Sequence, residues 1–151
     1  MTSNENSHKR KNKNIYLKNE RILAAMLESQ KKGQPTEEYG RCVMLIVENM
    51  LHGRSFRGYS QHMKEDMAGN AYLRCMKAIH TFNPKKTENA FGYITRTVWT
   101  AFLQILKDHY KHLNIKKSLF EKILAQTDDE FAKNQLLEWQ RNEWKDVEEN
   151  D

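Results

Sequence analysis

The sequence predicts an all-α protein, a compact domain of four to five helices with solvated segments at both ends. Apolar residues recur at steps of three and four, the period of a helix buried along one face. Two prolines and six glycines in 151 residues fall mostly between these periodic segments, where helices end. No segment alternates apolar and polar residues as a half-buried strand would. We expect residues 1–15 to form a disordered basic arm, 16–127 the helical domain and 128–151 an acidic tail.

The first three helices are defined by their ends. Apolar residues from Ile22 to Leu27 predict a short helix that ends near Gly33. Thr36 is placed to cap a second helix that runs to Met50 and stops before Gly53, and Ser60 to cap a third. In the third helix one apolar face is expected to be buried; its residues are Met63, Met67, Ala71, Cys75 and Ile79.

A turn at residues 82–86 precedes the longest helix, which we expect to restart at Thr87. Two adjacent apolar stripes predict a central helix packed over a wide arc. They are Phe91, Ile94, Val98, Phe102 and Ile105, and Trp99, Leu103, Leu106, Tyr110 and Leu113. The periodicity weakens after Leu113, so the apolar residues between Leu119 and Leu124 predict a separate short helix.

Charge divides the chain into two unequal parts. Residues 1–127 contain 22 basic and 11 acidic side chains, a net charge of +11. Residues 128–151 contain three basic and nine acidic side chains, a net charge of −6. A basic body indicates a polyanionic partner, and the acidic tail indicates a separate role. The longest apolar run, from Cys42 to Val47, is far too short to span a bilayer, so we expect a soluble intracellular protein without a membrane partner.

The residue types that usually perform catalysis or bind metals form no recognisable site pattern in this sequence. Cys42 and Cys75 lie within apolar helical patterns, where buried reduced thiols are usual. No Cys or His pair has zinc-ligand spacing with a second pair to complete it. His109 and His112 beside Asp108 lack any accompanying nucleophile or phosphate loop. We therefore expect neither an enzyme nor a metal or cofactor site.

One arc of the longest helix combines an aromatic ring, hydroxyls, an amide and cations at steps of three and four. We call this set the polar stripe; it consists of Tyr93, Arg96, Thr97, Thr100, Gln104, Lys107 and Lys111. Cations neutralise phosphates, and a tyrosine ring stacks on an unpaired base, so the stripe predicts a nucleic-acid surface. An ordinary solvated helix face remains the alternative.

The order of motifs resembles region 2 of the sigma-70 family of transcription initiation factors. An acidic start at Asp66, a helix ending in Ala78-Ile-His-Thr-Phe82-Asn83, and the sequence Tyr93-Ile-Thr95 follow one another as in that region. Met44-Leu-Ile-Val-Glu48, Phe56-Arg-Gly-Tyr59-Ser-Gln61 and Ala101-Phe102 are closer to the late-transcription sigma factors of T-even-like bacteriophages. The resemblance covers residues 16–117.

The resemblance implies a function in the cytoplasm of an infected bacterial cell. The third helix would bind the clamp helices of the largest subunit of host RNA polymerase through Asp66, Asn70, Leu73 and Met76, which we call the Asp66 face. The fourth would capture the nontemplate strand of a minus-ten-like promoter element, with Tyr93 as the stacking residue. Lys116 and Lys117 would add phosphate contacts to those of Arg96, Lys107 and Lys111. An ordinary solvated helix face is the alternative for the Asp66 face.

Two departures from the wider family limit what the resemblance implies. Many bacterial members have a Trp-Trp wedge just after the Tyr-x-Thr motif, where this chain has Arg96 and Thr97. Trp99 lies near positions that contact the edge of the duplex, although its apolar neighbours favour a role in the core. Only 27 residues follow Leu124, so we expect no minus-thirty-five recognition.

The acidic tail contains apolar residues that admit two interpretations. In T-even-like phages a C-terminal hydrophobic and acidic motif binds the replication sliding clamp, so the resemblance implies the clamp as a partner and leaves the need for a coactivator open. Leu136, Leu137, Trp139 and Trp144 are the matching candidates, although the exact motif is absent. The same residues could form one face of a helix that closes on the body.

Two other classes of function remain open from the sequence. One is a stand-alone helical DNA- or RNA-binding module that acts without polymerase. The other is a polymerase-binding inhibitor of the anti-sigma type, whose acidic tail imitates nucleic acid. Neither accounts for the ordered region-2 motifs.

Overall fold

The computed structural model describes the backbone of residues 17–148 and the side chains of residues 17–142. Every regular element in that part of the chain is a helix, which confirms the all-α prediction. The helices are α1 (Asn19–Lys32), α2 (Glu37–Leu51), α3 (Gln61–Thr81), α4 (Ala90–Gln126) and α5 (Glu130–Glu148). The predicted basic arm, residues 1–15, lies outside the described residues.

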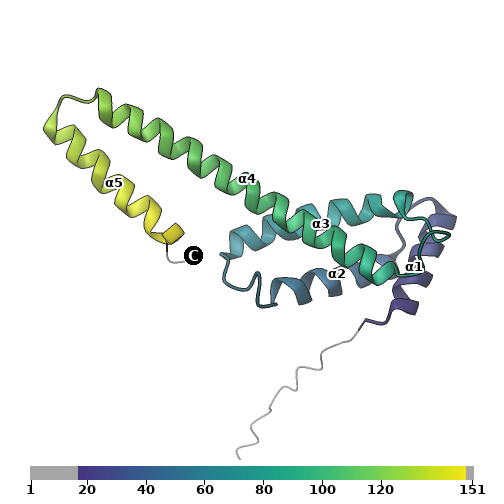
Figure 1. Ribbon diagram of the computed structural model, residues 1–151. Coiled ribbons are helices and arrows are strands. Elements are labelled where there is room, and N and C mark those ends of the chain that lie inside the picture. Colours follow the sequence, from purple (N-terminus) through teal and green to yellow (C-terminus); the bar gives the residue numbers. More distant parts are fainter. Residues whose placement is uncertain (1–16, 149–151) are drawn as a thin grey trace, which may run out of the picture.

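Figure 1 shows a body made of α1, α2, α3 and the first half of α4. The second half of α4 projects from this body, and α5 folds back in the opposite direction to form a helical hairpin with it. The most extensive helix pair is α3 with α4, and α1 and α2 pack against both. None of the described helices combines the length and apolar character needed to cross a membrane.

The ends of the first three helices follow the predicted local chemistry. Gly33 ends α1 with a φ of 71°, a left-handed conformation that favours glycine. Thr36 accepts a hydrogen bond from the amide of Tyr39 at the start of α2, and Ser60 does the same for Met63 in α3. These hydroxyls satisfy amides that the first turn of a helix leaves without a backbone partner.

The fourth helix differs from its prediction at both ends. It begins at Ala90 rather than Thr87, because Asn89 supplies the cap by accepting from the amide of Gly92. A Cβ on Gly92 would lie 2.5 Å from the side-chain amide nitrogen of Asn89, so a larger residue there would push the capping side chain aside. The predicted break after Leu113 is wrong: α4 continues to Gln126, since no glycine or proline lies between Gly92 and its end.

The core lies where α4 crosses the other three helices. Ile94, Val98 and Phe102 of the first predicted stripe are fully buried. The second stripe is packed only in part: Leu106 is buried, whereas Trp99 is 41% exposed and Leu103 is 45% exposed. The Trp99 ring nevertheless meets the buried Phe56 ring edge-on at 4.9 Å, so it lies at the boundary of the core. Cys42 and Cys75 are buried free thiols, as predicted.

Two amides from α1 hold the connection between α3 and α4. Gln30 Nε2 donates to the carbonyls of Ile79 and Phe82 at the end of α3, at 3.0 and 2.7 Å. Asn19 donates to the carbonyl of Glu88 and accepts from the amide of Phe91 at the start of α4, both at 3.0 Å. The turn between the two helices is therefore tied to α1 on both sides.

Candidate nucleic-acid interface

The polar stripe occupies one side of α4, and its N-terminal end lies against α3. Tyr93 is half-buried: its ring meets the Phe82 ring edge-on at 5.2 Å, and its hydroxyl lies 2.8 Å from that of Thr81. The Thr97 hydroxyl donates to the Tyr93 carbonyl and the Thr100 hydroxyl to the Arg96 carbonyl, both at 2.9 Å. These contacts orient the tyrosine ring and both threonines before any ligand binds.

A surface hollow, the proximal hollow, lies between α3 and α4 at this end of the stripe. Its lining residues are Arg74, Tyr93, Arg96, Thr97 and Thr100. Arg74 belongs to α3 and is not among the site residues predicted from the sequence. Its spacing from Asn70 and Lys77 puts it on a polar edge of α3, but only the crossing of the two helices brings it to Tyr93. The hollow combines two guanidinium groups, two hydroxyls and an aromatic ring, which suits a nucleotide with its phosphate.

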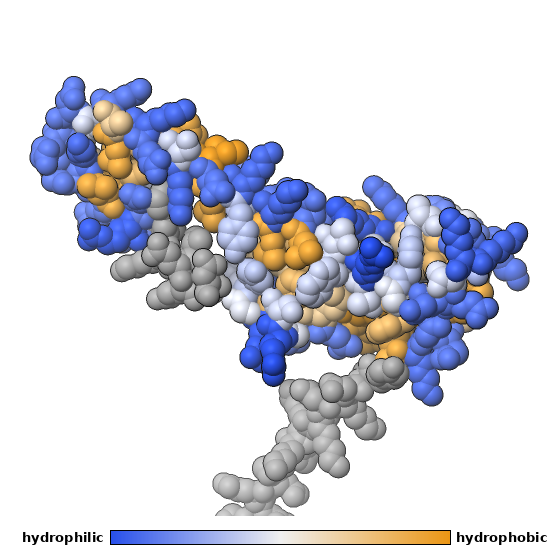
Figure 2. Space-filling view, viewed as in Figure 1, coloured by the Kyte–Doolittle hydropathy of each residue, from blue (hydrophilic) through white to orange (hydrophobic). Residues whose placement is uncertain are grey.

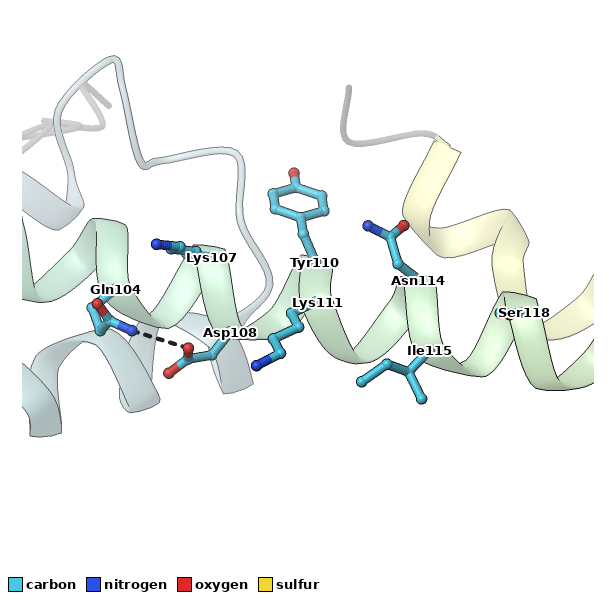
Figure 3. A pocket seen from close by; sticks show the side chains of 8 residues that line it. All are labelled: Gln104, Lys107, Asp108, Tyr110, Lys111, Asn114, Ile115 and Ser118. Atoms are coloured by element: carbon cyan, nitrogen blue, oxygen red, sulfur yellow. Dashed lines mark hydrogen bonds between the residues drawn. The ribbon is translucent and has the colours of Figure 1, made fainter.

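A second hollow, the distal hollow, lies further along α4 and is shown in Figure 3. Its lining residues are Gln104, Lys107, Asp108, Tyr110, Lys111, Asn114, Ile115 and Ser118. Gln104, Lys107 and Lys111 belong to the polar stripe, so the two hollows together contain all seven of its residues. The stripe predicted from spacing alone is therefore one face of one helix.

Lys116 and Lys117 lie elsewhere on α4. At 3.6 residues per turn they are about 140° and 120° round the helix from Tyr93, in opposite directions, whereas Lys111 lies directly in line with it. Thr95, from the motif in the resemblance, also points away from the stripe. In the part of the chain that the structure describes, its buried hydroxyl has no hydrogen-bond partner. Neither lysine is thus placed to bind the same phosphates as Lys107 and Lys111.

The Asp66 face lies on α3, away from the core. Asp66 is exposed and lies 3.7 Å from His62 one turn earlier, and Leu73 is 64% exposed. Met76 is half-buried and packs against the core. Asn70 lies at the border with α4, where its amide donates to the carbonyl of Ala101 at 3.0 Å. This face contains an acid and an unusually exposed leucine, and Asn70 also joins the two helices.

The acidic tail forms α5, which closes on the projecting half of α4 rather than on the body. The rings of Phe120 and Trp139 lie 5.7 Å apart, Leu136 is half-buried, and Leu137 is exposed. Trp144 lies outside the residues whose side chains the structure describes. Figure 2 shows apolar surface along this hairpin as well as on the body.

No protein-family model matches the chain, and no curated protein matches it.

Proposed function

We propose that this protein is a sigma factor for phage late transcription, which binds host core RNA polymerase and opens a minus-ten-like promoter element. The Asp66 face of α3 binds the clamp helices of the polymerase. The polar stripe of α4, with Arg74 added from α3, captures the nontemplate strand. The protein then acts in the cytoplasm of the infected bacterium.

One observation carries this proposal: two chemically different exposed faces lie on adjacent helices that are firmly joined. The face on α3 presents Asp66 and Leu73, while the stripe on α4 presents cations, hydroxyls and Tyr93. Asn70 joins the helices at their crossing. A factor that holds polymerase and promoter at the same time needs two such faces in a fixed relation. Of the motifs in the resemblance, the stretch from Asp66 falls on α3 and Tyr93-Ile-Thr95 on α4, whereas Met44–Glu48 falls on α2.

The energetics favour a factor that depends on polymerase. Extruding a base from the duplex costs a few kcal/mol, about what one stacking contact with Tyr93 returns. No Trp-Trp wedge follows Tyr93, so little is left to hold the fork open. Stable opening therefore requires the additional contacts of the polymerase complex, and the isolated chain binds promoter DNA weakly.

Transcription from a short AT-rich promoter with a minus-ten-like element, using core polymerase, tests the proposal. Initiation should need both the protein and the core enzyme. Specific promoter binding without core enzyme would favour the stand-alone module instead. Inhibition of a resident sigma factor without initiation would favour the anti-sigma alternative.

Variants separate the two faces. Tyr93→Ala should retain polymerase binding and impair opening, and Tyr93→Phe should restore opening because it keeps the ring. Asp66→Ala should weaken polymerase binding while leaving the stripe intact. Loss of polymerase binding in Tyr93→Ala, with the fold unchanged by circular dichroism, would contradict this division of roles.

Salt dependence identifies which lysines contact phosphate. The double variant Lys107→Gln/Lys111→Gln should reduce the log–log salt slope of promoter binding by holoenzyme by about 0.7 to 0.9 per contact. Lys116→Gln/Lys117→Gln is the matched control, because it removes the same charge from other faces of the same helix. Equal slopes for the two double variants would show that the stripe is not the phosphate surface.

The tail is proposed to dock on the phage sliding clamp, with or without a coactivator, through the apolar residues of α5. Leu137 and Trp139 support this, since both remain exposed although α5 packs on α4. Deletion of residues 134–151 should abolish clamp pull-down and leave basal transcription unchanged. Retained pull-down would exclude the tail as the clamp-binding segment.

A further inference from the structure

The polar stripe does not end where the body ends. Beyond Lys111 the same face of α4 continues through Asn114, Ser118 and Lys122, all of which are exposed. At 3.6 residues per turn each of these residues lies within about 60° of the line through Tyr93. The face therefore runs on for three turns along the projecting half of α4, beyond the seven residues of the polar stripe.

The distal hollow lies on this continuation, at the point where α4 leaves the body. Figure 3 shows Tyr110 and Asn114 directed to one side of α4, and Lys111 and Ile115 directed to the other. Lys107 and Lys111 supply its positive charge. Asp108 is the one acidic lining residue, and Gln104 Nε2 donates to its carboxylate at 3.0 Å.

The other half of the hairpin leaves this continuation open. Phe120, the residue of α4 that meets Trp139 of α5, lies about 180° round the helix from Tyr93. Ser118 and Lys122 remain exposed although α5 folds back along the same stretch of α4. A ligand can therefore lie on the stripe and its continuation without displacing α5.

We infer that the distal hollow, with Asn114 and Ser118 beyond the polar stripe, binds the phosphate backbone of the same nucleic acid that is held at Tyr93. The inference rests on the proposed function, because it extends the DNA surface assigned there to α4. Lys107 and Lys111, one turn apart, pair with phosphates, while Asn114 and Ser118 donate hydrogen bonds to phosphate oxygens. The carboxylate of Asp108 opposes binding and limits its strength.

The length of the face sets the length of the ligand. Tyr93 and Ser118 are separated by 25 residues, which at 1.5 Å per residue is about 37 Å. At 3.4 Å per stacked nucleotide this distance corresponds to about 11 nucleotides. A ligand confined to the proximal hollow would be only a few nucleotides long.

Fluorescence anisotropy of the full chain with labelled oligodeoxyadenylates of 4 to 16 nucleotides, at low salt, measures this length. Affinity should rise with length up to about 11 nucleotides and then level off. Longer oligonucleotides should gain only the small statistical increase that comes from offering more positions at which the site can bind. A parallel series of duplexes shows whether the backbone belongs to a single strand or to a double helix; a rise to that length in either series supports the inference. A plateau at four to five nucleotides in both series would overturn it.

Charge changes of opposite sign test the location of the site. Asp108→Asn should strengthen binding of the 12-nucleotide ligand about two- to fivefold, the effect of one exposed charge, whereas Glu20→Gln, an exposed change on α1, should not. Ser118→Glu should weaken binding by a similar factor, and His112→Glu, on another face of α4, should not. Equal effects within each matched pair would overturn the inference.

The proposed function and this inference fail in different ways. Failure of the protein to initiate with core polymerase overturns the proposed function, whatever the matched pairs show. Normal initiation, with matched pairs that bind DNA equally, overturns the extended site alone. Tyr93→Ala provides the internal reference, since it should weaken binding of every ligand length.

Discussion

The two halves of α4 have the same apolar spacing and opposite surroundings. Ile94, Val98 and Phe102 are spaced by four residues and are fully buried in the body. Ile115, Leu119 and Ile123 have the same spacing and are 47%, 55% and 50% exposed. Spacing by four residues thus determines that each set forms one helical face. What that face contacts depends on whether other helices reach it.

The largest expected difference between the halves is in stability. Phe102→Ala removes a fully buried ring that meets the Phe56 ring edge-on at 5.0 Å, so it should lower the free energy of unfolding by about 3–5 kcal/mol. Leu119→Ala should lower it by less than about 1 kcal/mol, because its side chain is already half in water. Urea denaturation measures both. Similar losses would mean that the projecting half is packed as tightly as the body.

Alkaline pH should weaken the body and not the hairpin. Burial raises the pKa of Cys75 from about 9 to about 12 and also raises the pKa of Tyr39, whose hydroxyl donates to the Cys75 carbonyl. Folding therefore favours the protonated forms, so their contribution is complete below pH 9 and is lost as the pH rises above it. The slope approaches about 1.4 kcal/mol per pH unit for each group.

Denaturation between pH 7 and 11 measures this loss, and two variants separate its sources. In Cys75→Ala the decline from pH 9 should become shallower but remain, because burial also raises the pKa of Cys42, and the loss due to Tyr39 should follow nearer pH 10. Tyr39→Phe should keep the decline from pH 9 that is due to Cys75. Stability that does not change up to pH 11 would contradict burial of both groups.

The crossing of α3 and α4 should depend modestly on Asn70. Asn70→Ala removes its hydrogen bond to the Ala101 carbonyl and should cost about 1 kcal/mol. Asp66→Ala, an exposed change on the same helix, should leave stability within about 0.5 kcal/mol. Thermal unfolding followed by circular dichroism compares them. A larger loss in Asp66→Ala would show that the Asp66 face is also structural.

Removal of the tail should have the smallest effect on the body. Deletion of residues 128–151 removes α5, whose ring contact is with Phe120 on the projecting half of α4. The near-ultraviolet circular dichroism of the body should give a melting temperature within a few degrees of that of the full chain, while the helical content falls. A drop in the melting temperature of more than about 5 °C would show that α5 also stabilises the body.

Local chemistry was enough to predict much of the body. Thr36, Gly33 and Ser60 mark helix ends because each satisfies or terminates the backbone by itself. The apolar period of α3 predicts its buried face, from Met63 to Ile79. The seven residues of the polar stripe were placed on one face because a regular helix fixes their relative directions.

Contacts between helices could not be predicted from such patterns. Arg74 joins the proximal hollow, and Asn70 bonds to Ala101, only because α3 crosses α4 at one particular place. Trp99 and Leu103 have apolar neighbours in sequence, but no helix covers that side of α4 fully. The continuation of α4 past Leu113 was missed because weakened periodicity indicates lost burial, and it was read as the end of a helix.

The two amides of α1 give that helix a role beyond its small size. Gln30 binds the end of α3 and Asn19 binds the start of α4. The α1 helix therefore fixes the connection between the two helices that bear the proposed binding faces. Loss of these hydrogen bonds would change the angle between those faces without altering either face. Gln30→Ala should therefore leave the separate affinities for polymerase and for single-stranded DNA near their normal values. It should lower promoter opening, the one activity that requires both faces to be correctly aimed at once.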